Sequence, residues 1–309
     1  MVVENQIPKS LHCVGGGVIE LPSSFVASSL VTGSFKGRKH DGSEPMDVLV
    51  RTGVNPSMFD NLVQKHKAKL EAAASSNVDI LREVITTGNG EVIFRIQRID
   101  DAFVSEIFSL RSESMISVRL HSFHNQYAEA EEILKRFARN VVETNSNAGL
   151  REVEGFCMGN VTIQGDFEIE RGSYLFQNGR GEHFDIDVDS YVKDERVTLL
   201  ERMSGPDSLL TVFDVSHNVF RARERTVAGM RAQEWLGSAQ VTEDEGERAF
   251  QFTLETMRPL PSRAFPKISL TFETAQPLED GTQTKTLISK DDAIRMWDSV
   301  VDSLRSTGS

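Results

Sequence analysis

Few residues of this chain could carry out covalent chemistry. Its 309 residues include two cysteines, Cys13 and Cys157, and seven histidines. His12 directly precedes Cys13, and an imidazole beside a thiol can activate it as a nucleophile. Successive side chains on a strand point to opposite faces, so His12 would point away from a Cys13 that faces the core. We therefore expect packed cysteines. Their number allows a disulfide, which we disfavour because each cysteine should lie in a separate core.

Two patterns resemble metal sites only in part. His121 and His124 are close in sequence, but no cysteine or further histidine lies nearby to complete the ligands that zinc usually takes. Asp185, Asp187 and Asp189 resemble the start of a calcium loop, but the glycine and the final carboxylate of such a loop are missing. Their alternation with apolar residues indicates a strand with one wet face. We expect no metal.

The motifs of common enzyme classes do not occur in the sequence. There is no Gly-x-Ser-x-Gly motif and no phosphate-binding loop that ends in Gly-Lys-Ser/Thr. Gly15-Gly16-Gly17 precedes a predicted strand, whereas a dinucleotide site needs glycines between a strand and a helix. The sequence therefore predicts no catalytic residue and no cofactor, and it favours a protein that acts by binding.

Composition and charge narrow the class of partner. The formal net charge is −12, which argues against nucleic acid, because phosphates attract basic surfaces. No segment reaches the ~20 apolar residues of a membrane-spanning helix. The first residues lack the charged and apolar regions of a secretory leader. We expect either a cytoplasmic protein or the mature form of an exported one.

The two cysteines mark related motifs. Cys13 and Gly15 recur as Cys157 and Gly159, and in each motif three residues and an isoleucine follow the glycine. Cysteine packs as a small apolar side chain, and glycine lets another backbone approach. We interpret both motifs as structural, each at the start of one of two related modules. The polar segment 145–149 has the composition of a linker, so the predicted domains are residues 1–146 and 147–309.

The predicted fold is α+β, with each module an antiparallel sheet covered by one or two helices. The first module should contain helices near 55–74 and 125–143, an exposed loop at 33–45, and strands at 24–31, 46–51, 79–87, 91–98, 102–110 and 114–123. The meander from 79 to 123 should bury one face. The second module should end in a helix capped by Ser289, after strands at 155–163, 166–176, 183–192, 197–202, 209–215, 221–227, 232–238, 250–257 and 268–275.

Charged side chains cluster at several predicted surface positions. Arg221, Arg223 and Arg225 share one strand face, which is either a solvated edge or a surface that recognises acidic groups. The segment 243–247 is an acidic loop that could attract a basic partner. As candidate partner contacts in exposed loops we name Lys36, Arg38, Lys39, Arg180, Glu243, Asp244, Glu245 and Glu247.

Several segments resemble a known bacterial family. Three lie in the second half of the chain: Phe156–Gly159, Thr226–Gly229 with Glu234, and Met296–Val301. The Cys13–Gly15 motif, continuing to Pro22, lies in the first half, although Gly16 stands where we associate an arginine with the family. In this order they resemble the two domains of immunity proteins that neutralise type VI secretion lipase effectors.

The resemblance implies a function and a location. Members of this family are periplasmic, often lipid-anchored, and made with a leader that this sequence lacks, so a membrane tether would need that leader. They bind a cognate phospholipase, clamp its lid between two domains and block substrate access without a catalytic residue of their own. Two alternatives stay open, namely an adaptor or structural protein of the cell envelope and an enzyme with an unrecognised site that uses Cys13 or the histidines. A cytoplasmic location is the alternative to the periplasm.

Overall fold

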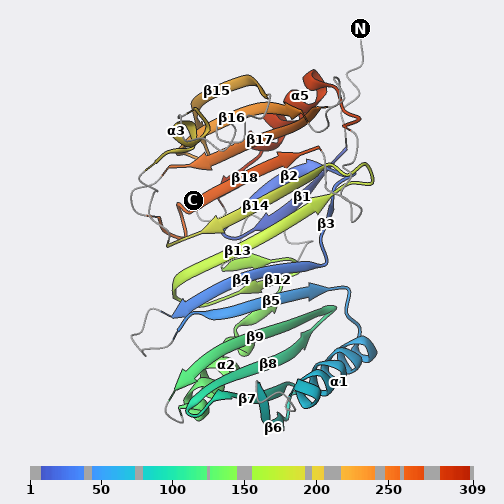
Figure 1. The fold of residues 1–309 in the computed structure, drawn as a ribbon, viewed down its shortest axis with the longest axis vertical. Helices are drawn as coiled ribbons and strands as arrows, with labels where there is room; N and C mark the ends of the chain where they lie inside the picture. Colours follow the sequence, from blue (N-terminus) through green and yellow to red (C-terminus); the bar gives the residue numbers. More distant parts are fainter. Residues whose placement is uncertain are drawn as a thin grey trace. The chain divides into compact units, whose positions relative to one another are not determined.

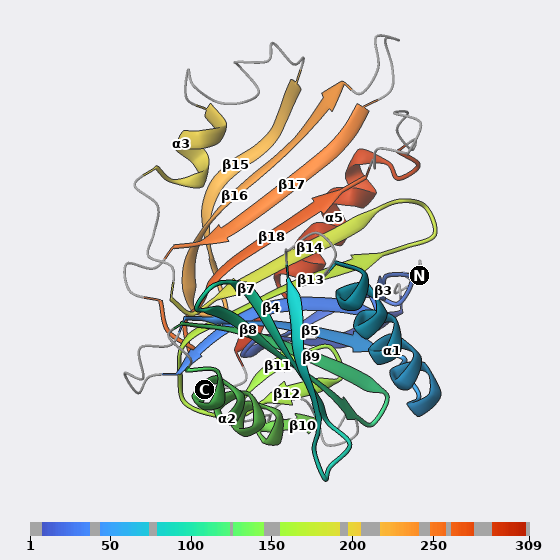
Figure 2. The same cartoon turned by 60° about the horizontal axis from the view of Figure 1, so that its bottom comes forward.

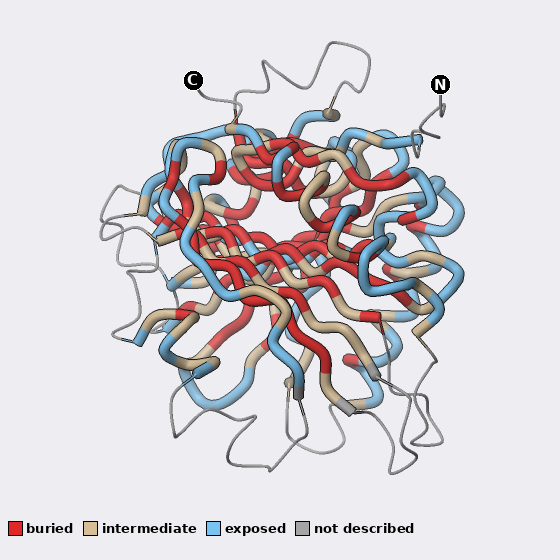
Figure 3. The backbone as a smooth tube through the Cα atoms, turned by 90° about the horizontal axis from the view of Figure 1, so that it is seen from above, coloured by how far each residue is buried: buried red, intermediate tan, exposed pale blue. Residues whose placement is uncertain are grey.

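The protein is mostly antiparallel β-sheet with a few helices, an α+β architecture (Figure 1). The computed structural model describes residues 8–37, 44–73, 79–123, 126–144, 155–191, 197–204, 217–240, 248–257, 261–274 and 286–306. The chain divides into two compact units, which are residues 1–28 with 173–309 (unit 1) and residues 29–172 (unit 2). Buried residues concentrate along the strands (Figure 3).

Unit 2 contains a sheet in the order β4-β5-β9-β8-β7-β6 and a small sheet in the order β10-β12-β11. Its elements are β4 (Leu30–Gly37), β5 (Met46–Thr52), α1 (Pro56–Ala73), β6 (Ile80–Thr86), β7 (Val92–Ile99), β8 (Ala102–Arg111), β9 (Ser114–Phe123), α2 (Tyr127–Arg139), β10 (Val141–Glu143), β11 (Phe156–Met158) and β12 (Val161–Ile163). The meander of four strands predicted from 79 to 123 is confirmed as β6 to β9. The predicted start of α1 is also confirmed, because Asn55 Oδ1 accepts a hydrogen bond of 2.9 Å from the Met58 amide.

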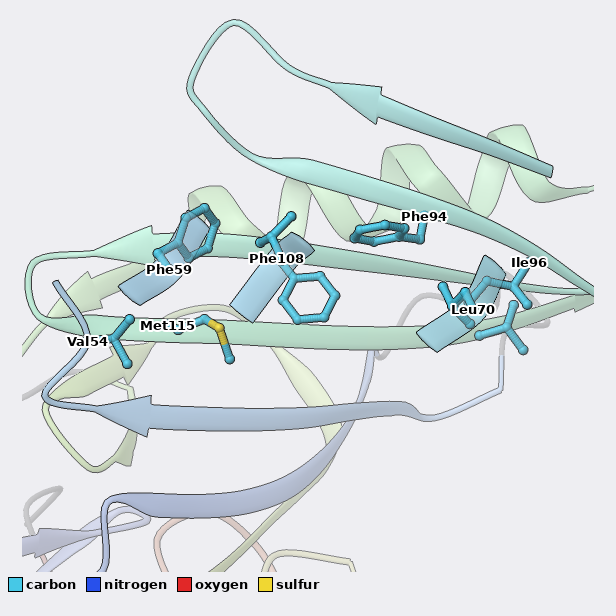
Figure 4. Packing of buried hydrophobic residues seen from close by; sticks show 9 residues of the cluster. Val54, Phe59, Leu70, Phe94, Ile96, Phe108 and Met115 are labelled. Atoms are coloured by element: carbon cyan, nitrogen blue, oxygen red, sulfur yellow. The ribbon is translucent and has the colours of Figure 1, made fainter. Parts of the chain in front are cut away.

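Within the meander, β7, β8 and β9 are buried on both faces, so the prediction of one buried face was wrong for these strands. Phe94 and Phe108 belong to a core cluster with Phe59 of α1 (Figure 4). Phe103 lies on the other face of β8, where its ring is 5.1 Å from that of Tyr127 in α2. Helices on both faces explain why nearly every residue of β8 is buried. The two helices are labelled in Figure 2.

Two other predictions for unit 2 were wrong in part. Residues 33–37 continue β4 instead of forming a loop, because Val31 and Phe35 are buried on one face of the strand. The second helix ends at Arg139, and the chain continues as β10, which pairs with β12. All of the predicted linker, residues 145–149, lies outside the described residues.

Unit 1 contains the strand order β15-β16-β17-β18-β14-β13, with β3 on β13, and a small sheet in the order β1-β2-β19. Its elements are β1 (Lys9–Val14), β2 (Gly17–Pro22), β3 (Val26–Ala27), β14 (His183–Asp189), α3 (Leu199–Ser204), β15 (His217–Val227), β16 (Met230–Gln240), β17 (Arg248–Thr256), β18 (Lys267–Glu273), α5 (Lys290–Val301) and β19 (Arg305–Ser306). The strand β13 (Phe167–Gln177) is divided between the units, and its part from Ser173 onward belongs to unit 1. The cap of α5 is confirmed, since Ser289 Oγ accepts from the Asp292 amide at 3.2 Å.

The strand predicted at 197–202 is instead the helix α3. Thr198 and Glu201 form a reciprocal capping box, in which the Thr198 amide donates to Glu201 Oε2 at 2.8 Å and the Glu201 amide to Thr198 Oγ1 at 3.5 Å. The sequence Thr-x-x-Glu was the signal that the strand prediction missed. The strand predicted at 209–215 lies outside the described residues.

The compact units differ from the predicted domains. β10 and β12 lie on either side of the predicted boundary at 146/147, yet they pair within unit 2. Residues 1–28 belong with the C-terminal part of the chain in unit 1. The division into folding domains at 146/147 stays a prediction.

Gly33 and Gly37 in β4 give a matched test of packing in unit 2. A Cβ atom at Gly33 would overlap the Arg171 carbonyl oxygen and lie 2.8 Å from Met158 Cε, whereas one at Gly37 would meet nothing within 4 Å. We expect Gly33→Ala to lower the free energy of unfolding by about 2–3 kcal/mol, since a strand backbone cannot move aside cheaply. Gly37→Ala should leave it almost unchanged. Urea denaturation checks this, and equal midpoints for the two variants would contradict it.

Candidate partner-binding site

Only part of the predicted contact set can be placed. Lys36 lies near the end of β4 and is half-buried. Arg180 is exposed between β13 and β14, in a turn where its amide donates to Asn178 Oδ1 at 2.9 Å. These two residues belong to different units. The remaining predicted contacts lie outside the described residues: Arg38, Lys39, Glu243, Asp244, Glu245 and Glu247.

The three arginines of β15 surround a single buried carboxylate. Glu234 of β16 is 0% exposed. Its Oε1 lies 2.8 Å from Arg221 Nε and 3.0 Å from Arg223 Nε, and its Oε2 lies 2.8 Å from Arg225 Nη1. The Arg221 contact is off the hydrogen-bond direction and is therefore mainly electrostatic. A carboxylate this deeply buried needs such cations, because burial disfavours its charged form.

The network extends to helix α5. Trp297 Nε1 donates to Glu234 Oε2 at 2.8 Å, and the Arg221 guanidinium donates to both Asp298 oxygens at 3.1 and 2.6 Å. Arg225 also pairs with Asp302. Burial disfavours the charge on Arg221, but Asp298 and the other carboxylates outweigh it and raise the pKa of Arg221. The arginines thus bind groups of their own unit, and neither alternative considered for them from the sequence describes this role.

Both Cys-x-Gly motifs are tight hairpins. Val14 pairs with Gly17 across Gly15-Gly16, and Met158 pairs with Val161 across Gly159-Asn160. The glycine after each apolar residue has positive φ, +58° at Gly15 and +62° at Gly159, as two-residue hairpin turns require. The glycines serve the turns, and each cysteine lies two residues before its glycine.

The expectation for the cysteines was wrong. Cys13 and Cys157 are both disulfide-bonded, and the described part of the chain contains no free cysteine. Cys13 is only half-buried, so it does not lie inside a closed core as we expected. The sequence had allowed a disulfide by number, and we disfavoured it because we expected each cysteine to lie in a separate core.

His183 forms ion pairs with Asp185 and Glu273. His183 Nε2 lies 3.4 Å from both Asp185 Oδ2 and Glu273 Oε2. Burial disfavours its charge, but the Glu273 hydrogen bond and the two carboxylates raise the pKa of His183. Asp187 and Asp189 follow on the same face of β14 as Asp185. Within the described ranges, no group of three potential ligands could hold a metal.

His12 packs against an aromatic ring within unit 1. His12 packs against Phe176 with ring centroids 4.8 Å apart, and burial lowers the pKa of His12. His121 lies in β9, while His124 is outside the described residues.

In the described part of the chain, no helix is both long enough and apolar enough to cross a membrane.

Comparison with known proteins identifies the family. A family model for the C-terminal domain of Tle cognate immunity protein 4 matches residues 151–307, just over half of the chain. This chain belongs to the Tle cognate immunity protein 4 family. No curated protein matches the sequence.

Solved structures of immunity proteins share the fold of this family member. The apo immunity protein TplEi of the type VI secretion system of Pseudomonas aeruginosa is 18% identical, with a TM-score of 0.71 and 98% of each chain covered. TplEi complexed with "L" peptide is 20% identical, with a TM-score of 0.68 and coverage of 97% of this chain and 99% of that one. A chain of the Tle4–Tli4 complex is 20% identical, with a TM-score of 0.69 and 97% of each chain covered.

The structure brings together residues that carried the family resemblance. Glu234, Trp297 and Asp298 come from separate segments and meet in the arginine network. Thr226–Gly229 leads into the β15–β16 turn, where Ala228 and Gly229 both have positive φ, +50° and +73°. These family residues therefore build unit 1, and they do not form an exposed site.

Glu234→Gln tests whether the network stabilises the fold. Removing the negative charge leaves the arginines without their shared partner, and we expect a loss of about 3–5 kcal/mol in the free energy of unfolding. Glu224→Gln on the neighbouring strand is the matched control, because Glu224 pairs at 3.0 Å with the exposed Arg231. The control should unfold like the parent in urea. Equal destabilisation of both variants would contradict the role assigned to Glu234.

Proposed function

We propose that this protein binds and inhibits a cognate phospholipase or lipase effector of a type VI secretion system. Membership in the Tle cognate immunity protein 4 family is the observation that carries this proposal. The similarity to a chain of the Tle4–Tli4 complex extends over 97% of this chain and supports it.

The proposed mechanism is steric. The two predicted domains, 1–146 and 147–309, grip the mobile lid of the lipase and hold it closed, so that substrate cannot reach the buried serine. Two linked contacts raise each other's effective concentration. Protection of a cell needs a tight complex, which favours an interface of ~1,600 Å² or more.

In this proposal the immunity protein supplies no reaction. An enzyme that used Cys13 would need a free thiolate, whereas Cys13 is disulfide-bonded. His12 contacts Phe176 and its pKa is lowered by burial, which does not make it a partner for such a thiolate. These contacts favour binding over the enzyme alternative.

We propose that the protein works in the periplasm. Disulfides persist in oxidising compartments such as the bacterial periplasm and are rare in the cytosol, and both cysteines of this chain are disulfide-bonded. The cytoplasmic alternative would leave Cys13 and Cys157 reduced.

Inhibition of the cognate lipase tests the function. We expect phospholipid hydrolysis to fall to background once the protein reaches a 1:1 molar ratio, because a tight complex is stoichiometric. A lipase effector of another family is the control and should stay active. Undisturbed hydrolysis by the cognate lipase at several-fold excess of this protein would contradict the proposal, and binding without inhibition would favour the adaptor alternative.

A further inference from the structure

One face of the strands β4, β5 and β9 in unit 2 is left open. Val48 and Val50 of β5 are buried on one face, while Asp47, Leu49 and Arg51 alternate with them on the other. Leu49 packs at the margin of the α1 core cluster, so this is the face of the sheet on which α1 lies. Asp47 is exposed and Arg51 half-buried, which shows that α1 covers only part of it (Figure 2).

The strand register shows which side chains share this face. Asp47 is paired with Ser34 on one side and Arg119 on the other, and Leu49 with Thr32 and Ser117. Lys36 follows Ser34 on the same face by alternation. We call the surface formed by Thr32, Lys36, Asp47, Arg51 and Arg119 the open face.

The reverse side of the same strands is closed. The ring of Phe35 lies 5.5 Å from Phe137, 5.3 Å from Phe156 and 5.2 Å from Phe167. Among the described residues of β4 and β5, the exposed side chains therefore lie on the open-face side of the strands.

The open face is basic in a protein of formal charge −12. It holds three cations, Lys36, Arg51 and Arg119, against the single exposed carboxylate of Asp47. Lys36 and Arg51 have no ion-pair partner among the described residues, and Arg51 Nε is buried without a hydrogen-bond acceptor. A buried donor without an acceptor is destabilising.

Arg119 is only partly neutralised by its own unit. Its Nε lies 3.8 Å from Oε2 of the buried Glu106, and its side chain is 41% exposed. Glu106 already accepts from Ser117 Oγ at 2.9 Å and lies 3.0 Å from His66 Nε2. Burial disfavours the Glu106 charge, but His66, Arg119 and Ser117 outweigh it and lower the pKa of Glu106. Glu106 therefore attracts Arg119 electrostatically without a hydrogen bond to Arg119 Nε, and the Arg119 side chain stays partly exposed.

We propose that the open face binds a carboxylate-bearing segment of the lipase effector, with Arg51, Arg119 and Lys36 pairing with its aspartates or glutamates. This inference rests on the proposed function and names the chemistry of the contact. Guanidinium groups bind carboxylates through paired hydrogen bonds.

An anionic membrane fits the open face less well. Asp47 and Glu106 lie among the cations, and the Arg51 Nε atom is recessed. Membrane surfaces attract clusters of several protruding lysines and arginines without acidic neighbours. Recessed cations interleaved with carboxylates favour a partner of defined shape.

Charge reversal tests the proposal. Lys36→Glu and Arg51→Glu should each raise the Kd for the cognate lipase at least tenfold, measured by surface plasmon resonance in 50 mM NaCl, because a like charge would then face the partner's carboxylates. Added salt should reduce the difference in Kd between each variant and the parent protein, because salt screens the charges. Arg136→Glu is the matched control, since Arg136 is exposed on α2, which covers the opposite face, and it should bind like the parent. Circular dichroism confirms that each variant is folded, and Lys36→Glu keeps the test valid if Arg51→Glu unfolds.

Each result separates the two proposals. If the parent protein neither binds nor inhibits the lipase, the proposed function fails. If the parent inhibits the lipase and both charge-reversal variants bind it with a Kd within twofold of the parent's, the function stands and the open-face proposal is overturned.

Binding to vesicles of phosphatidylethanolamine and phosphatidylglycerol is the second measurement. Vesicle binding that is lost in Arg51→Glu, with lipase binding unchanged, would show that the open face recognises lipid and would also overturn the proposal.

Discussion

A carboxylate without solvent exposure must be neutralised by its neighbours, and Glu234 imposes this requirement on unit 1. Burying a charge is tolerated only when it is paired and hydrogen-bonded. Arg221, Arg223 and Arg225 approach it from one strand, and Trp297 donates from α5. The requirement therefore fixes the α5 helix against the β15–β16 hairpin. It also commits the arginines of β15 to the fold, so that recognition of a partner has to use other residues.

The strands of the unit 2 sheet differ in how many of their faces are covered. α1 and α2 bury the strands β7 and β8 from both sides, while β4 and β5 are sealed on one side only. Cations outnumber carboxylates on the open face, and Arg51 and Lys36 have no ion-pair partner within the described residues. A protein that acts by binding needs charged side chains that its own fold leaves unpaired, held by a rigid sheet.

Local signals predicted much of the fold. The meander of unit 2 followed from alternation and turn residues, and the caps at Asn55 and Ser289 followed from local hydrogen bonding. The failures depend on distant contacts. The strand character of 33–37 comes from burial of Phe35 against three other rings, and the β15 arginines are explained only by Glu234 across the hairpin. Of the predicted contacts, Lys36 lies on the open face, whereas Arg51 was missed although its alternation with Val48 and Val50 was visible.

The central claim is that the protein acts by presenting a shaped, charged surface to a lipase. Determining the structure of the complex with the cognate lipase tests this most directly, through the distance from the Arg51 guanidinium to the nearest lipase carboxylate. The account predicts a contact within about 4 Å, the limit for an ion pair, with the open face buried beneath the lipase. A complex in which β4, β5 and β9 remain solvated, or in which the lipase active site stays open to substrate, would contradict it.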